Sequence, residues 1–281
     1  MSAQAERWRE RGEAAKARLV AAHGRHSSLQ LGWSLYEGDS AIGGGLLAGA
    51  LAYRLFVLLL PTALLLVSGL GLYAGAVDKT TTEVTREAGL HGLFASNVAA
   101  TASGGARPLV FLVMIPVVVY AAAKLYRALA VVNGIVWLST GRAGRTTSRG
   151  SFLLLAVLFA TLAATEIVSW IRGHDQLGGL SALLVYAVVV GGAWFALSLE
   201  LPHGDAPWTA LVPGSLLFGV GALAVNVFNV YFTARLVENR ADTYGALGIA
   251  AALLFSLVLV GRLAVVSAEL NAVLFRRDAE L

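Results

Sequence analysis

The stretch Leu46–Val77, LLAGALAYRLFVLLLPTALLLVSGLGLYAGAV, decides the fold, because its length and apolar character suit a helix that crosses a lipid bilayer. Its single charged residue is Arg54, and about 20 apolar residues are enough to span the hydrocarbon core. The stretch lacks the alternation of an outer-membrane strand, so a helix must satisfy its backbone hydrogen bonds. The chain therefore enters the membrane at this segment.

The rest of the chain has the same character. It is 57% hydrophobic and 14% charged, with a mean hydropathy of +0.72. A soluble domain usually carries about 25% charged residues, so the composition excludes that class. We predict an all-α polytopic membrane protein in which six transmembrane helices form a bundle. The five later spans are expected within Pro108–Leu138, Gly150–Ile171, Gln176–Leu199, Ala206–Ala234 and Thr243–Leu274.

Charge divides the chain into three regions. Residues 1–45 predict a basic amphipathic cytoplasmic arm with no cleavable signal peptide, residues 46–275 the membrane domain, and residues 276–281 a cytoplasmic tail. The segment Asp78–Arg107 predicts one or two short extracytoplasmic helices between spans one and two. With both termini inside, the cytoplasmic segments carry eleven Lys and Arg residues and the outer segments six. This bias predicts cytoplasmic termini.

Three arginines interrupt the apolar runs. Counting from the nearer run end at helical rise places Arg54, Arg127 and Arg262 at depths of about 12, 16 and 18 Å. A charge at such depth costs at least about 2.5–3.5 kcal/mol, so it normally faces a partner, the bundle interior or a water-filled cavity. We expect the three guanidinium groups to converge at a common level and to make an intramembrane cavity basic.

Three further charged residues lie in the predicted spans. Lys124 shares a helix face with Arg127 and joins the predicted substrate-binding set. Glu166 lies at the depth of Lys124, and Glu269 follows Arg262 by two turns, so either carboxylate can form an ion pair or serve in proton coupling. Complete pairing still leaves two of the four cations over. They bind an anion, or they snorkel or bond backbone carbonyls as structural arginines.

Polar and helix-bending residues complete the set of candidates. Asn226 and Asn229 lie one turn apart on span five, where they line a polar cavity or form hydrogen bonds between helices. Pro61, Pro116 and Pro213 are expected to kink spans one, two and five. Such kinks serve as hinges in transporters.

Nothing in the chain indicates catalysis. The five histidines all fall in the arm or in loops without metal-ligand spacing, there is no cysteine, and no phosphate-binding loop pattern occurs. We therefore expect no enzyme activity, no catalytic residue, no metal and no cofactor. The positive-inside bias accounts for the basic charge, so no nucleic-acid partner is expected.

Several segments between residues 40 and 275 act together as a signature. They are Leu51-Ala52-Tyr53-Arg54-Leu55-Phe56 with Leu60-Pro61, Trp208 with Pro213-Gly214, Tyr244-Gly245-Ala246-Leu247-Gly248, and Ala268-Glu269-Leu270-Asn271-Ala272. In this order they resemble the YihY/BrkB family of bacterial inner-membrane proteins, historically mislabelled ribonuclease BN. The chain departs from the family at Phe255-Ser256-Leu257, where Trp and Tyr are usual, and at Arg54, where many relatives have a neutral residue.

The resemblance implies six transmembrane helices with both termini in the cytoplasm. Its YhjD-like branch is linked to movement of lipid A precursors across the inner membrane. We therefore predict a transporter or flippase of an anionic lipid or a lipid-linked saccharide, acting through a basic intramembrane cavity, with membrane lipids as its partners. The alternatives are an exporter of small anionic or zwitterionic solutes and a non-transporting scaffold or assembly factor. The sequence specifies neither the substrate nor the oligomeric state.

Overall fold

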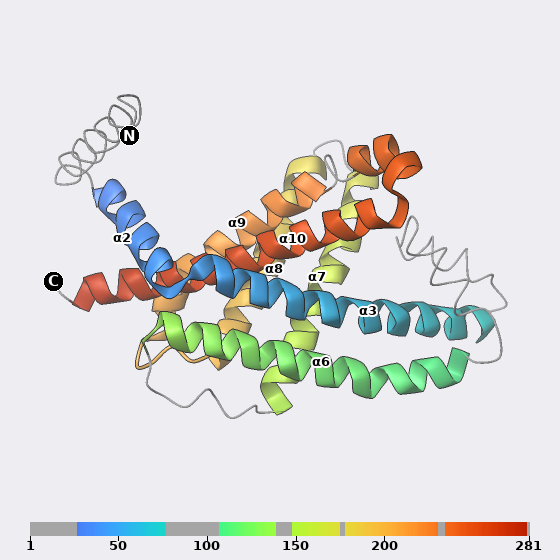
Figure 1. Cartoon of the computed structure of the whole chain (residues 1–281), viewed down its shortest axis with the longest axis horizontal. Helices are drawn as coiled ribbons and strands as arrows, with labels where there is room; N and C mark the ends of the chain where they lie inside the picture. The colour runs from blue at the N-terminus through green and yellow to red at the C-terminus, as the bar shows by residue number, and fades with distance from the viewer. Residues whose placement is uncertain (1–26, 77–106, 139–147, 175–177, 230–233, 280–281) are drawn as a thin grey trace, which may run out of the picture.

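The computed structural model describes residues 27–76, 107–138, 148–174, 178–229 and 234–279, and its regular elements there are all helical. The all-α prediction is confirmed for this part of the chain. The amphipathic helix predicted within residues 1–26 and the extracytoplasmic helices predicted within 78–107 lie outside it, apart from Arg107 itself. In chain order the elements are α2 (Ser27–Ile42), α3 (Gly44–Ala76), α6 (Arg107–Val136), α7 (Ser148–His174), α8 (Gly178–Glu200), the 3-10 helix η1 (Trp208–Leu211), α9 (Val212–Phe228) and α10 (Ala234–Ala279), as Figure 1 shows.

Five helices are long and apolar enough to cross a membrane, so the protein is an integral membrane protein. Their candidate spans are Gly44–Tyr73, Pro108–Val136, Leu183–Glu200, Trp208–Phe228 and Leu253–Arg277. On α7 the qualifying apolar stretch, Arg149–Ala164, is shorter than a span, although the search covered only the described residues. A sixth transmembrane helix therefore stays a prediction.

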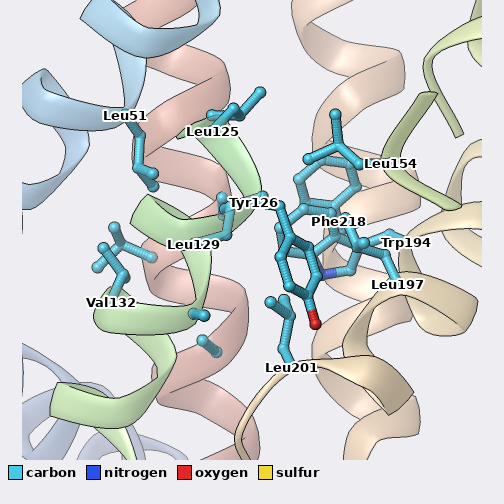
Figure 2. Close-up of a cluster of buried hydrophobic side chains, with 14 of the residues drawn as sticks. Leu51, Leu125, Tyr126, Leu129, Val132, Leu154, Trp194, Leu197, Leu201 and Phe218 are labelled. Atoms are coloured by element: carbon cyan, nitrogen blue, oxygen red, sulfur yellow. The ribbon is translucent and has the colours of Figure 1, made fainter. Parts of the chain in front are cut away.

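The six long helices close into a ring around one core. α3 packs on α6, and each following helix packs on the next until α10 returns to α3. α2 lies outside this ring, against α10 and α3. Figure 2 shows how side chains such as Leu51 and Leu129 fill the interior, opposite the rings of Trp194 and Phe218. Those two rings stack with centroids 4.0 Å apart and planes 4° apart, which joins α8 to α9.

Small residues let the helices approach closely. A Cβ placed at Gly261 of α10 would lie 2.5 Å from the Ala48 carbonyl oxygen of α3, so only glycine fits there. A Cβ at Gly191 of α8 would lie 3.0 Å from the Ser215 carbonyl oxygen of α9. Close backbone contact favours association in lipid, where apolar side chains gain little from leaving the bilayer.

A polar clasp fixes the start of α9 to α10. The Gly214 backbone N–H donates to Asn271 Oδ1 at 2.6 Å, the Ser267 hydroxyl donates to the Gly214 carbonyl at 2.5 Å, and Asn271 Nδ2 donates to the Leu211 carbonyl at 3.3 Å. Asn271 thereby satisfies an N–H group that the first turn of a helix leaves unpaired. This clasp brings together two segments of the signature, Pro213-Gly214 and Ala268–Ala272.

The expected kink at Pro213 is wrong. α9 begins at Val212, so Pro213 stands in its first turn, where the missing N–H has no intrahelical partner to lose. Pro61 and Pro116 do lie inside α3 and α6. The run Ala206–Ala234 also contains more than one helix, because η1 precedes α9 and α9 ends at Phe228.

We expect Gly261→Ala to destabilise the protein by about 1–3 kcal/mol, because the new methyl group must push α10 away from α3. The matched control is Gly192→Ala, since a Cβ at this exposed glycine of α8 meets nothing within 4 Å. Thermal and denaturant unfolding of both variants in the same detergent measures the difference. Equal stability of the two variants would contradict the close contact.

Candidate functional site

The ring encloses a central cavity of about 260 Å³, to which all six long helices contribute. Its walls are mainly leucine, valine and aromatic side chains. The lining includes Leu51, Leu55 and Leu58 of α3, Leu125 and Leu129 of α6, Leu154 and Leu158 of α7, Val190 and Trp194 of α8, Phe218 of α9, and Val260 and Ala264 of α10. The mainly apolar walls suit an apolar occupant.

Four polar side chains, Thr161, Tyr186, Asn226 and Asn229, also line this cavity. The Tyr186 hydroxyl and the Asn226 side chain form a hydrogen bond between α8 and α9. Asn229, at the end of α9, accepts a hydrogen bond of 2.6 Å from the Ser256 hydroxyl of α10. The two asparagines therefore line the cavity and also form hydrogen bonds between helices, which were the two alternatives drawn from the sequence.

The central cavity is not the expected basic cavity, which stays a prediction. Arg54, Lys124, Arg127 and Arg262 are all absent from the lining of the central cavity. The physical reason is the cost of placing unpaired cations in a low-dielectric interior. Each of the four instead lies partly or fully on the outer surface of the ring.

Arg262 is neutralised by Asp39 of α2. Its two Nη groups each contact one carboxylate oxygen at 2.5 Å, and the side chains are 39% and 18% exposed. This bidentate geometry is the strongest that a guanidinium and a carboxylate adopt. The sequence analysis had offered Glu269 as the partner of Arg262, whereas the ion pair that the structure shows is with Asp39.

Two glycines make this ion pair fit. Gly43 takes a φ of +66° and separates α2 from α3. A Cβ on the next residue, Gly44, would overlap the Asp39 carboxylate and lie 2.8 Å from Arg262 Nη1. The sequence analysis missed Asp39 because it lies in the arm, outside every apolar run. The run Gly43-Gly44-Gly45 was the available signal, since consecutive glycines indicate a turn that changes the direction of the chain.

Arg54 and Arg127 do share a level. Gly69 of α3 lies against Phe111 of α6, and the two helices run in opposite directions in Figure 1. Fifteen residues back from Gly69 is Arg54, and fifteen residues on from Phe111 is the neighbour of Arg127. The Arg262 guanidinium instead lies beside Gly44, ten residues before Arg54 on α3, or about 15 Å at helical rise. The Arg262 guanidinium therefore lies ten residues along α3 from the backbone of Arg54, and a common level of all three guanidinium groups stays a prediction.

The two arginines are exposed on the ring. Lys124, one turn before Arg127, is half-buried, and its Nζ lies 5.1 Å from the ring centroid of Tyr120. This geometry is typical of a cation–π contact. We call Arg54, Lys124 and Arg127 the cation level. Because α3 and α6 are candidate spans, these exposed charges face lipid or another molecule.

The structure describes the side chain of Glu269 but not that of Glu166. Glu269 of α10 is 4% exposed, and its Oε1 finds no hydrogen-bond partner among the residues described. Glu166 lies on α7 in the stretch 165–174, whose side chains are outside the description, so its pairing with Lys124 stays a prediction.

Comparison of the chain with protein-family models, with curated proteins and with solved structures finds no match. The resemblance to the YihY/BrkB family therefore rests on the quoted segments alone and stays a prediction.

We expect the substitutions Asp39→Asn and Arg262→Gln to be coupled by about 1 kcal/mol, within the range for contacting residues. A double-mutant cycle on the free energy of unfolding measures this term. The same cycle on Arg262 and Glu269 should give a smaller value, because Glu269 makes no contact with Arg262 that competes with Asp39.

The fit of Gly44 gives a second test of the ion pair. Gly44→Ala should abolish most of the coupling between Asp39 and Arg262, because the methyl group occupies the space of the carboxylate. Gly45→Ala is the control, since a Cβ there meets nothing within 4 Å. Unchanged coupling in Gly44→Ala would mean that the pair does not depend on the glycine.

Proposed function

We propose that this protein is a flippase that moves an anionic lipid or a lipid-linked saccharide across a bacterial inner membrane, and that the cation level guides the charged headgroup. The observation that carries the proposal is the shared level of Arg54 and Arg127 on adjacent, antiparallel spans. Lys124 adds a third positive charge one turn away on the same face of α6.

Depth makes these charges unusual. Arg54 lies ten residues inside the candidate span Gly44–Tyr73, and Arg127 lies nine residues inside the end of Pro108–Val136. These positions correspond to depths of about 15 and 14 Å at helical rise, within a hydrocarbon core of about 30 Å. A passing phosphate compensates such charges better than water does there. The guanidinium fork donates two hydrogen bonds to it at once and keeps its charge in a medium of low polarity.

The surface around the cation level suits lipid tails. Apolar side chains within about one turn of the cations are exposed, namely Tyr53 and Val57 of α3 and Tyr120 and Val131 of α6, with Tyr120 at 64%. A lipid whose headgroup contacts the arginines can therefore keep its acyl chains in the bilayer beside these helices. The central cavity supports no headgroup path, because its walls are apolar. The proposed route thus runs along the outer face of α3 and α6 and not through the ring.

A scaffold without transport activity is the second candidate, and paired charges favour it. Arg262 is bound by Asp39, and Arg149 Nε lies 3.1 Å from Glu200 Oε1, which links the start of α7 to the end of α8. In a scaffold the exposed cations would contact acidic groups of a partner protein. An exporter of small solutes has less support, because the ring shows no polar path through its centre among the described residues.

The test is lipid translocation in proteoliposomes. We expect Arg54→Gln and Arg127→Gln each to slow the transfer of a fluorescent anionic phospholipid by about 10- to 100-fold. Loss of one charge-assisted hydrogen bond costs about 1.5–3 kcal/mol, which corresponds to that range. Transfer of a zwitterionic lipid should change much less, because the charge on the headgroup sets the interaction.

Arg277→Gln is the matched control, since Arg277 is an exposed arginine in the last turn of α10 and is not part of the cation level. Arg262→Gln should affect stability more than lipid selectivity. Unchanged transfer of the anionic lipid in the double variant at Arg54 and Arg127 would overturn the flippase assignment. It would leave the scaffold as the better account.

A further inference from the structure

A second cavity lies between α2, α6 and α10, apart from the central one. Its volume is about 180 Å³, and most of its wall is apolar, with Leu35 and Ile42 from α2 and Val136 from α6. Two charged residues of α10 also line it, namely Glu269 and Arg276. We call it the α2 pocket. Ile42, the last residue of α2, and Val136, the last residue of α6, both line it. The pocket therefore lies where α3 begins and α6 ends, at the boundary of the predicted membrane core.

Glu269 has an unmet need for a hydrogen-bond donor. The side chain is 4% exposed, and in the part of the chain described its Oε1 accepts no hydrogen bond. Arg262 and Arg276 each lie seven residues from Glu269 on α10; Arg262 already gives both Nη groups to Asp39, and the Nε of Arg276 donates to the Ala272 carbonyl. A buried carboxylate without a donor is costly, so a ligand that brings an N–H or O–H group would be bound favourably.

The walls of the pocket restrict the chemistry of this ligand. Calcium and magnesium need six or more oxygen ligands, whereas Glu269 is the one carboxylate among the described lining residues. An organic ammonium fits better, because it donates hydrogen bonds to a carboxylate and tolerates apolar neighbours. A primary ammonium offers three N–H donors, whereas a trimethylammonium offers none.

Arg276 supplies the opposite charge. It is exposed, it lines the pocket, and its Nε donates to the Ala272 carbonyl at 3.2 Å. A guanidinium at the mouth of the pocket suits a phosphate. One carboxylate inside and one guanidinium at the rim match a ligand in which an ammonium and a phosphate are joined by a short linker.

We propose that the α2 pocket binds the headgroup of a phosphatidylethanolamine-type lipid, with its ammonium at Glu269 and its phosphate at Arg276. The bilayer supplies this class of molecule at the level of the pocket. Asp39 and Arg262 hold α2 against α10 and so keep the wall formed by Leu35 and Ile42 in place. The site does not rest on the proposed flippase route, because it shares no residue with the cation level.

The test is competition between two lipids for the purified full chain. The protein is incubated with equimolar dioleoylphosphatidylethanolamine and dioleoylphosphatidylcholine, and the retained lipids are counted by native mass spectrometry. We expect the wild type to retain the ethanolamine lipid about tenfold more, as one charge-assisted hydrogen bond allows. Glu269→Gln should reduce this ratio to near one. Arg276→Gln should lower retention of both lipids without changing the ratio, because both carry a phosphate.

Two further variants keep the test decisive if Glu269→Gln folds poorly. Gly38→Val should fill the pocket from α2 and remove the preference, since Gly38 lines the pocket and a Cβ there meets nothing within 4 Å. Arg277→Gln, next to Arg276 but absent from the lining, should keep the wild-type ratio. Equal retention of the two lipids by the wild type, or an unchanged ratio in both Glu269→Gln and Gly38→Val, would overturn the proposal. The first of these results would mean that Glu269 holds only a proton.

Discussion

The ion pair between Asp39 and Arg262 is the interaction on which the charged part of this structure depends. An arginine in an apolar helix needs a counter-charge, and Asp39 provides it with both oxygens. This pairing commits Arg262 to Asp39, and among the residues that the structure describes no donor reaches Glu269 Oε1. It also holds α2 against the ring, where it forms one wall of a pocket. One pairing therefore fixes the position of α2 and neutralises Arg262.

Much of the fold follows from the sequence, because apolar run length and backbone satisfaction in lipid leave few alternatives. The level shared by Arg54 and Arg127 was also predictable, since α3 and α6 begin and end close to the ends of their apolar runs. The position of the Arg262 guanidinium beside Gly44 was not predictable. Counting from Leu274 assumed that the helix ends with its apolar run, but α10 continues to Ala279 and its arginine reaches back to Gly44. Asp39 was missed because partners distant in sequence leave no periodic signal.

Charged side chains avoid the centre of the ring, where the dielectric constant is low. The centre of the ring is lined mainly by leucine, valine and aromatic side chains, and of its polar groups Tyr186, Asn226 and Asn229 form hydrogen bonds across helices, whereas Thr161 bonds within α7. The cations lie on the outside or beside a carboxylate. A protein that spans a bilayer thus keeps its interior as apolar as a soluble core and places its chemistry at the rim. This arrangement directs attention to the lipid-facing surface rather than to a channel.

α10 is a helix of 46 residues, whose N-terminal part turns away from the axis of the long remainder in Figure 1. It carries the contact with Asp39, the close approach to Ala48 and the clasp on Gly214, all within three turns of Arg262. The contacts of α10 with α2, α3 and α9 thus lie side by side on one segment, so a change at the Asp39–Arg262 pair acts beside the other two seams.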